Sequence, residues 1–489
     1  MKPSIILITC DELRRDVLSC YGGQAVHPPN LDRLAASGVR FDRAYTASPV
    51  CLPSRSSILT GLYPHNHRAY SNFRDCSLSP EIPNLYRQLG NNGYHTGHIG
   101  KCHYVPVPYS QTKHDQTQPG DAFRAHYLSL GMHDLILQDG KHNSLRFYDD
   151  YSTALDAAGY LSAYRDEAWK PANRKVFSFP GPAEWHPDSW VGRRAREYVD
   201  GYTDPAPLFL WVSFSGPHYP FDAPAAYLER VNEAHIGAGA YEEGEFDEPT
   251  RIHHASFHGP GGIDGAGSAP DRACKNYTDD YWHRLRRQYF ANVALIDDQV
   301  GLLLASLERR FGDNTMIVFT TDHGELLGNH RLWGKNNCAY EDVWNVPLLL
   351  RYPGTEGGSD GIATDGVNGT DGAAVAAVHE RVSLIDIAPT CLRTAGVEGA
   401  KTDGVDLREV IASGGRPHVI CETSDYLAVS DGEHKLIHFR RGETRFVELF
   451  DLKRDPGEFR NVAQLPEYSA ARAKLSGLIA ELFVDTLLS

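Results

Sequence analysis

The 489-residue sequence lacks several features that would assign it to a special class of protein. Its nine cysteines include no Cys-x-x-Cys pair, and their odd number does not fit a framework built only of disulfides. No stretch approaches the roughly 20 apolar residues of a membrane span. The N-terminal segment MKPSIILITCDELRR has a short apolar run that leads into acids, unlike a secretory signal peptide. We therefore expect a cytoplasmic protein with reduced cysteines and no membrane partner.

Positive charge is also in short supply. The chain has 48 Lys and Arg against 63 Asp and Glu, which gives a net charge of −15. Such a chain is not expected to bind nucleic acid non-specifically. If its substrate is anionic, the site must carry its own positive charge from a metal, lysines and arginines. The 41% of hydrophobic and 23% of charged residues are otherwise ordinary for a globular protein.

Four apolar runs have the β-branched composition of buried parallel strands. They are Ile5–Thr9, Leu208–Ser213, Met316–Thr320 and Val346–Arg351. Between residues 285 and 307, apolar side chains recur every three or four positions, which predicts a helix packed on the core. The alternation of strands and helices predicts an α/β domain with a mostly parallel central sheet flanked by helices.

The C-terminal part of the sequence changes character. Short strand-like runs at His418–Glu422 and His434–Phe439 precede a helical segment at Ala470–Phe483. This order predicts a small C-terminal α+β domain. We place the domains at residues 1–405 and 406–489.

Three segments show little periodicity. Residues 104–190 and 231–280 are expected to be irregular insertions of the kind that shape substrate pockets. Residues 354–374 are rich in glycine and aspartate, which predicts a flexible loop.

Reactive side chains follow three of the predicted strands. Asp11 and Glu12 follow the first, His218 follows the second, and Asp322 and His323 follow the third. Ligands of open parallel sheets bind outside the carboxyl ends of the strands. A single Asp–His pair would be an ordinary solvated loop, but three such groups at strand ends predict one cluster. Its carboxylates and imidazoles suit a hard or borderline divalent cation.

A second group of functional residues begins at Cys51. Pro53 suits the first turn of a helix, because it has no N–H to leave unpaired. Cys51 would then lie at the helix N-terminus, where free N–H groups and the helix dipole favour negative charge. Arg55, one turn on, adds a bidentate ligand for an oxyanion. A lone cysteine is usually a small buried hydrophobe, but these polar neighbours do not fit a core position.

The string CLPSRSSILTG at residues 51–61 resembles the sulfatase signature C-x-P-S-R-x-x-x-L-T-G. Further segments similar to that family are ITCDELRRDVLSCYGG, GKCHY, GPHYPF, TTDHGELLGNHRLWGKNNCAYED and ELFDLKRDPGEFRNVA. The resemblance implies the fold of the alkaline phosphatase superfamily, with a large α/β domain and a small C-terminal one. It implies a sulfuric ester hydrolase that releases inorganic sulfate from an organic sulfate monoester.

The resemblance also implies roles for individual residues. Cys51 would be oxidised to Cα-formylglycine by a maturation enzyme, and its geminal diol would be the nucleophile. The implied ligands of one divalent metal are Asp11, Glu12, Asp322, His323 and the converted Cys51. The implied residues that bind and polarise the sulfate are Arg55, Lys101, His103, His218 and Lys335. Asp322 would help to deprotonate the nucleophile, His218 would protonate the leaving alcohol, and His103 would act as the later base.

Two positions depart from the commonest family pattern. Position 12 is Glu where many members have Asp, and position 323 is His where many calcium-dependent sulfatases have Asn. The family implies Ca²⁺, whereas an imidazole ligand favours Mn²⁺. A histidine there also occurs in relatives that cleave phosphonate and phosphate esters, so a phosphonate monoester or phosphodiester hydrolase is the alternative activity.

A third hypothesis is a non-catalytic anion-binding member of the fold. The presence of both nucleophile and acid argues against it, since a binding protein needs neither. The sequence leaves open whether the substrate is a small-molecule or a saccharide ester, and it leaves the oligomeric state open.

Overall fold

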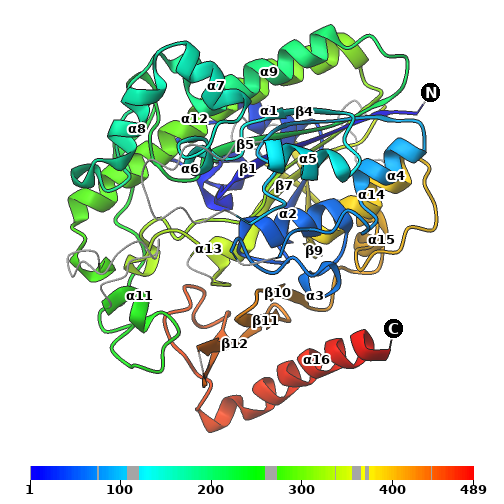
Figure 1. The fold of residues 1–489 in the computed structure, drawn as a ribbon. Coiled ribbons are helices and arrows are strands. Elements are labelled where there is room, and N and C mark those ends of the chain that lie inside the picture. Colours follow the sequence, from blue (N-terminus) through cyan, green and yellow to red (C-terminus); the bar gives the residue numbers. More distant parts are fainter. Residues whose placement is uncertain are drawn as a thin grey trace.

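A nine-stranded sheet forms the centre of the computed structural model (Figure 1). The structure describes residues 2–73, 76–106, 121–258, 273–335, 338–354, 365–368, 374–441 and 443–488. The strand order is β4-β3-β5-β1-β6-β7-β2-β9-β8. The strands are β1 (Ser4–Asp11), β2 (Val39–Tyr45), β3 (His95–Gly100), β4 (Asp134–Leu137), β5 (Leu208–Pro217), β6 (Thr315–Thr321), β7 (Asn345–Arg351), β8 (Asp365–Asn368) and β9 (Ala374–Ser383).

The sheet is mostly parallel, as predicted. Strands β4, β3, β5, β1 and β6 run in one direction side by side, and β9 is parallel to β2. The prediction for Val346–Arg351 was wrong, because this segment is β7 and pairs antiparallel with both β6 and β2. An apolar run indicates that a strand is buried on both faces, but burial does not determine whether the strand is parallel or antiparallel to its neighbours.

Helices cover both faces of the sheet. In β1, Ile6 and Ile8 belong to a core shared with helices on one face, while Ile5 and Leu7 belong to the core of the other face. The first face carries α1 (Pro29–Ala36), α9 (Pro187–Gly201) and α12 (Asp279–Phe311) (Figure 1). The second carries α2 (Cys51–Thr60), α4 (Leu85–Asn91), α14 (Ile387–Thr394) and α15 (Leu407–Ala412). Successive side chains of β1 point to opposite faces of the sheet, so the strand contributes residues to both cores.

Helix α12 extends the helix predicted at residues 285–307 in both directions. Thr278 caps its start by accepting a hydrogen bond from the Tyr281 N–H, and Gly312 ends it at φ 60°. By length and composition alone this helix could cross a membrane, but 67% of its most apolar 18-residue window is buried inside the structure. That burial fits the predicted role in the core.

Residues 104–190 are more regular than predicted. Their described part contains β4, α5 (Asp121–Ser129), α6 (Lys141–Ser144), α7 (Asp150–Ala157), α8 (Leu161–Trp169) and the start of α9. These elements are mostly too short to show a hydrophobic period, which explains why the sequence pattern missed them. The described part of 231–280 contains only short helices before α12 begins. The loop predicted at 354–374 lies largely outside the described residues, and its described segment 365–368 is strand β8.

A small α+β unit follows, as predicted. Strands β10 (Val419–Glu422), β11 (Tyr426–Ser430), β12 (His434–Arg441) and β13 (Thr444–Asp451) form an antiparallel sheet in sequence order. Helix α16 (Ser469–Leu488) lies beside this sheet, and its Leu475 is buried with Leu436 and Leu449 (Figure 1). The domain boundary at 405–406 stays a prediction.

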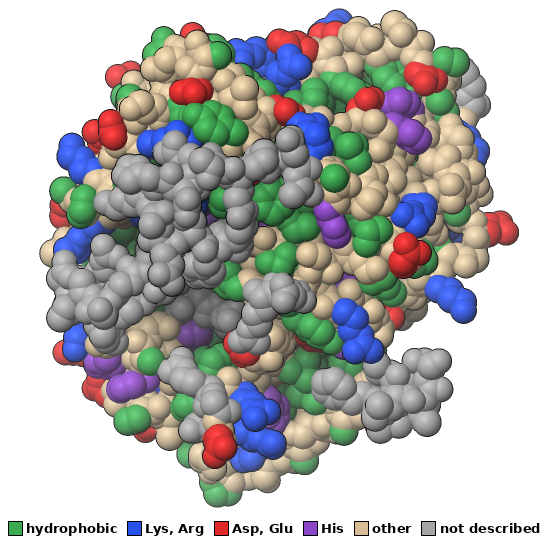
Figure 2. Space-filling view, in the orientation of Figure 1, with side chains coloured by type: hydrophobic (Ala, Val, Ile, Leu, Met, Phe, Trp, Pro, Cys, Tyr) green, Lys and Arg blue, Asp and Glu red, His purple; other side chains and the backbone are tan. Residues whose placement is uncertain are grey.

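The cysteines and the surface agree with an ordinary globular chain. All nine cysteines are free, and eight of them are buried. On the face in Figure 2, lysine and arginine side chains are interspersed with aspartate and glutamate.

Candidate active site and metal centre

The carboxyl ends of β1, β5 and β6 meet at one edge of the sheet. Asp11 is in register with Pro217 of β5, and Cys10 is in register with Thr321 of β6. The backbone N–H of His218 donates to the carbonyl of Asp11 over 3.1 Å. The side chains predicted at the three strand ends are therefore brought together.

Helix α2 brings Cys51 to the same edge. Cys51 is the first residue of the helix and is 1% exposed. Asn72 accepts a hydrogen bond from the Leu52 N–H, one of the groups that a helix start leaves unpaired. The Ser54 hydroxyl donates to the carbonyl of Asp322 over 2.6 Å, which ties the helix to the end of β6. Asn72 thus helps to cap the start of α2, and Ser54 holds the helix against the end of β6.

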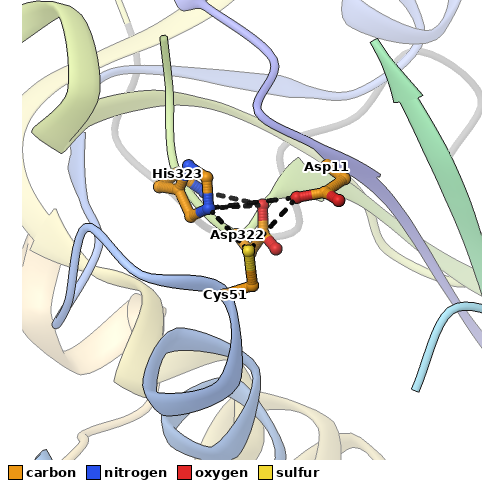
Figure 3. Close-up of side chains that lie close together, drawn as sticks. All are labelled: Asp11, Cys51, Asp322 and His323. Carbon is orange, nitrogen blue, oxygen red and sulfur yellow. Dashed lines mark hydrogen bonds and ion pairs between the residues drawn. The ribbon is translucent and has the colours of Figure 1, made fainter. Parts of the chain in front are cut away.

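Four potential metal ligands converge (Figure 3). One donor atom from each of Asp11, Cys51, Asp322 and His323 lies within 4.8 Å of the others. Cys51 Sγ is 3.2 Å from His323 Nε2 and 3.6 Å from Asp11 Oδ1. His323 Nδ1 lies 2.9 Å from the carbonyl of Gly324, which can only accept, so Nδ1 carries the proton and Nε2 faces the cluster. Two carboxylates and an imidazole around the residue at 51 fit one divalent cation.

Glu12 lies beside this group rather than in it. Its Oε1 accepts a hydrogen bond from Lys335 Nζ over 2.7 Å, and its Oε2 is 3.7 Å from His218 Nε2. Among the described residues, Oε2 has no hydrogen-bond partner. Burial raises the pKa of Glu12 to about 8, with Lys335 opposing the rise and Glu325 adding to it. Glu12 as a metal ligand stays a prediction.

The positive charge that an anionic substrate needs is present. Lys101 Nζ pairs with Asp11. Arg55 is fully buried, and its Nε donates to Asp322 Oδ2 over 2.8 Å. Its Nη1 donates to the carbonyl of Lys101 and the hydroxyl of Ser213, while its Nη2 has no hydrogen-bond partner among the described residues. These cations surround the cluster in a chain whose overall charge is negative.

The cluster favours negative charge at position 51. Burial and Asp11 raise the pKa of the Cys51 thiol, but Lys101, Lys335 and His323 outweigh them and hold it well below its usual value. Burial lowers the pKa of His323, yet Asp322 and Cys51 raise it to about 9. Two kinds of anion could therefore be stabilised here, a thiolate or a deprotonated hydroxyl.

His218 and Lys335 lie side by side. Lys335 Nζ is 3.3 Å from His218 Nε2, and His218 Nδ1 is 2.6 Å from the carbonyl of Tyr219. Burial, Lys335 and Lys101 hold the pKa of His218 well below its usual value, against the opposing effect of Asp11. An anionic ester placed beside the imidazole would favour its protonated form.

His103 lies three residues after the end of β3 and two residues after Lys101, and its side chain is buried. Its φ is 53°, and its N–H donates to Asp139 Oδ1 over 2.9 Å. Neither ring nitrogen has a hydrogen-bond partner in the described part of the chain, so its role as a base stays a prediction. Sequence reasoning missed Asp139, which fixes this turn. It follows the end of β4, and the same strand-end signal could have found it had β4 been recognised.

Comparisons with known families decide the assignment. A family model described as "Sulfatase" matches residues 3–397. The chain belongs to the sulfatase family. A second model, described as "N-sulphoglucosamine sulphohydrolase, C-terminal", matches residues 328–485. Both the large sheet and the small C-terminal unit thus have counterparts among sulfatases.

Relatives within and around the sulfatase family span nearly the whole chain. The arylsulfatase of Clostridium perfringens is 27% identical over 496 residues, covering 96% of this chain and 92% of the relative. A multifunctional alkaline phosphatase superfamily protein of Trinickia caryophylli is 28% identical over 522 residues, covering 96% and 93%. The crystal structure of a phosphonate monoester hydrolase of Agrobacterium radiobacter matches with a TM-score of 0.77 and 23% identity, covering 99% and 96%. This sulfatase family member is an enzyme, and its fold is that of the alkaline phosphatase superfamily.

Proposed function

We propose that this sulfatase hydrolyses a sulfate monoester of a small molecule or a saccharide, with formylglycine at position 51 as nucleophile and one divalent metal as cofactor. The observation that carries the proposal is the convergence of Asp11, Asp322 and His323 on Cys51 at the start of α2. The nearby cations support it, because a sulfate ester brings negative charge to this edge of the sheet.

The modified side chain explains why position 51 is a cysteine. Hydrated formylglycine carries two hydroxyls, one to attack the sulfur atom and one whose loss of a proton releases the product. A serine has no second hydroxyl and would remain esterified. In this proposal Asp322 takes a proton from the nucleophile. Arg55 and Lys101, which pair with Asp322 and Asp11, offset the charge of the transferring group. The modification requires a formylglycine-generating maturation enzyme as a partner.

The metal would be held by Asp11, Asp322, His323 and the oxygen at position 51, with Glu12 as a further ligand. A bound divalent cation supplies Lewis-acid stabilisation of negative charge at the reacting group. We propose Ca²⁺ on the pattern of the family, with Mn²⁺ as the alternative that His323 favours.

We expect His218 to act as the general acid that protonates the leaving oxygen. General acid catalysis is worth about 10²–10⁴-fold, so His218→Ala should lower kcat by that factor on an alkyl sulfate. The loss should be much smaller on nitrophenyl sulfate, because nitrophenolate leaves with little protonation. Steady-state kinetics on both esters measure the difference. His65→Ala, which removes a buried histidine paired with Glu422 of β10, is the control.

Equal losses of His218→Ala on the two esters would refute the acid role. They would assign the proton to Lys335, whose Nζ is 3.3 Å from the imidazole.

A second candidate function is hydrolysis of phosphonate monoesters or phosphodiesters on the same site. His323 in the cluster favours it. The deciding experiment compares kcat/KM on an aryl sulfate, an aryl phosphonate and a phosphodiester, using protein whose formylglycine content is confirmed. The highest value on the sulfate supports the first proposal, the highest value on either phosphorus ester supports the second, and no turnover of any of the three contradicts both.

A further inference from the structure

A buried network of charged side chains lies behind the segment that carries His218. Lys141, Asp188 and Asp222 have side chains that are 0% exposed. They come from α6, the first turn of α9 and the segment after β5, and Asn292 of α12 joins them (Figure 1). None of these residues is a member of the metal cluster or has a role in the proposed chemistry.

Asp188 fixes the chain before His218. Its Oδ1 accepts hydrogen bonds from the backbone N–H of Ser215 over 3.0 Å and of Gly216 over 2.8 Å. Its Oδ2 accepts from Asn292 Nδ2 over 2.9 Å. The backbone at position 216 lies so close to these two side chains that only glycine fits. A Cβ there would lie 2.3 Å from Asp188 Oδ2 and 2.5 Å from Asn292 Oδ1.

Lys141 fixes the chain after His218. Its Nζ donates to the carbonyl of Pro220 over 3.3 Å and to Asp222 Oδ1 over 2.6 Å. It also donates to Asn292 Oδ1 over 2.7 Å, so one asparagine links the two ends. The backbone on both sides of the imidazole is thus anchored to side chains that have no freedom to move into solvent.

Stability alone does not account for this arrangement. Buried ion pairs repay their desolvation only with good geometry, and apolar residues of the same volume are often at least as stabilising. Here Asp188 and Lys141 instead make directional hydrogen bonds to the backbone on either side of His218. Such contacts fix an orientation, and a misplacement of about 1 Å in a catalytic group can cost about 10²-fold in rate.

We propose that Lys141 and Asp188 are positioning residues for His218, which hold its Nε2 beside Lys335 and toward the leaving oxygen of the substrate. The inference rests on the proposed function for its kinetic consequence and on the contacts above for its geometry. Neither residue touches the reacting atoms.

The test compares two buried aspartates that each accept hydrogen bonds from two backbone N–H groups. Asp188 accepts from the N–H groups of Ser215 and Gly216. Asp297 accepts from the N–H groups of Asn30 and Leu31 at the start of α1. Asp188→Leu should lower kcat on an alkyl sulfate by about 10–100-fold, with a smaller loss on nitrophenyl sulfate. This is the range known for partners that orient metal ligands, and a misplaced general acid should cost a similar factor. Asp188→Asn, which keeps one acceptor oxygen, should restore much of the loss, and Asp297→Leu should affect both esters equally.

A double-mutant cycle separates positioning from general damage. In a His218→Ala background, Asp188→Leu should cost less than about threefold on the alkyl ester, because contacting groups are not additive. A full additional 10–100-fold loss would overturn the proposal. If Asp188→Leu does not fold, Lys141→Met takes its place in the same cycle.

A spectroscopic readout keeps this inference apart from the function itself. The ring ¹⁵N signals of His218, assigned by their loss in His218→Ala, should shift in Asp188→Leu and stay in place in Asp297→Leu. Unshifted signals would overturn the proposal even in an active enzyme. Shifted signals in a protein that turns over no ester would support the positioning role while contradicting the proposed function.

Discussion

Replacing Cys51 with alanine should lower kcat by about 10⁴–10⁶-fold, the scale on which loss of a nucleophile acts in other hydrolases. The side chain is buried at the first residue of α2, and its Sγ is 3.2 Å from His323 Nε2. Cys51 is both the first residue of α2 and a member of the four-residue cluster. Cys391→Ala, which truncates a buried cysteine of α14, is the matched control and should keep its activity.

Mass spectrometry of the peptide that contains Cys51 tests the modification directly. Conversion of the thiol to the aldehyde lowers the peptide mass by about 18 Da, while the peptide that contains Cys391 should be unchanged. Co-expression with graded amounts of the maturation enzyme should give activity in proportion to the converted fraction. Full activity in protein whose Cys51 is entirely an unmodified thiol would rule out formylglycine as the nucleophile.

Removing the metal should have the second largest effect. A bound cation contributes several kcal/mol to the stabilisation of charge, so chelation should lower kcat by about 10³-fold or more. Asp322→Asn should lose metal and activity together, because it withdraws one ligand charge from a site that also contains Asp11 and His323. Metal content is measured by elemental analysis before and after chelation, and turnover is measured on re-addition of Ca²⁺ or Mn²⁺.

Asparagine is the informative substitution at position 322. It keeps an oxygen that can accept from the N–H groups of Glu12 and His323, whereas alanine would leave both N–H groups without this acceptor. Asp297→Asn, in a buried carboxylate that caps α1, should keep its metal and is the control. Metal-free protein that retained the full rate would show that the chemistry runs without a cation.

Strand existence could be predicted from the sequence more securely than strand direction. The apolar runs at Ile5–Thr9 and Leu208–Ser213 are both buried on two faces, and they are parallel neighbours. The run at Val346–Arg351 has the same composition and lies antiparallel. Direction depends on which connection precedes a strand, and that is a property of the whole chain. Short helices such as α6 and α7 could not be predicted for a different reason. A helix of fewer than about three turns is too short to show a hydrophobic period.

The sequence by itself determined the chemistry of the site. Local rules predict that Cys51 starts a helix and that acidic and imidazole groups directly after apolar strands form one cluster. The resemblance to sulfatases adds the prediction that Cys51 is the nucleophile and that this cluster holds the metal. Only the tertiary structure decided that Glu12 pairs with Lys335 through Oε1, and that Asp188 and Lys141 make hydrogen bonds to the segment around His218. These contacts join residues far apart in the chain through side-chain orientation and burial, and neither is written in local sequence. Motif and periodicity report what a residue can do, whereas long-range packing fixes which partner it meets.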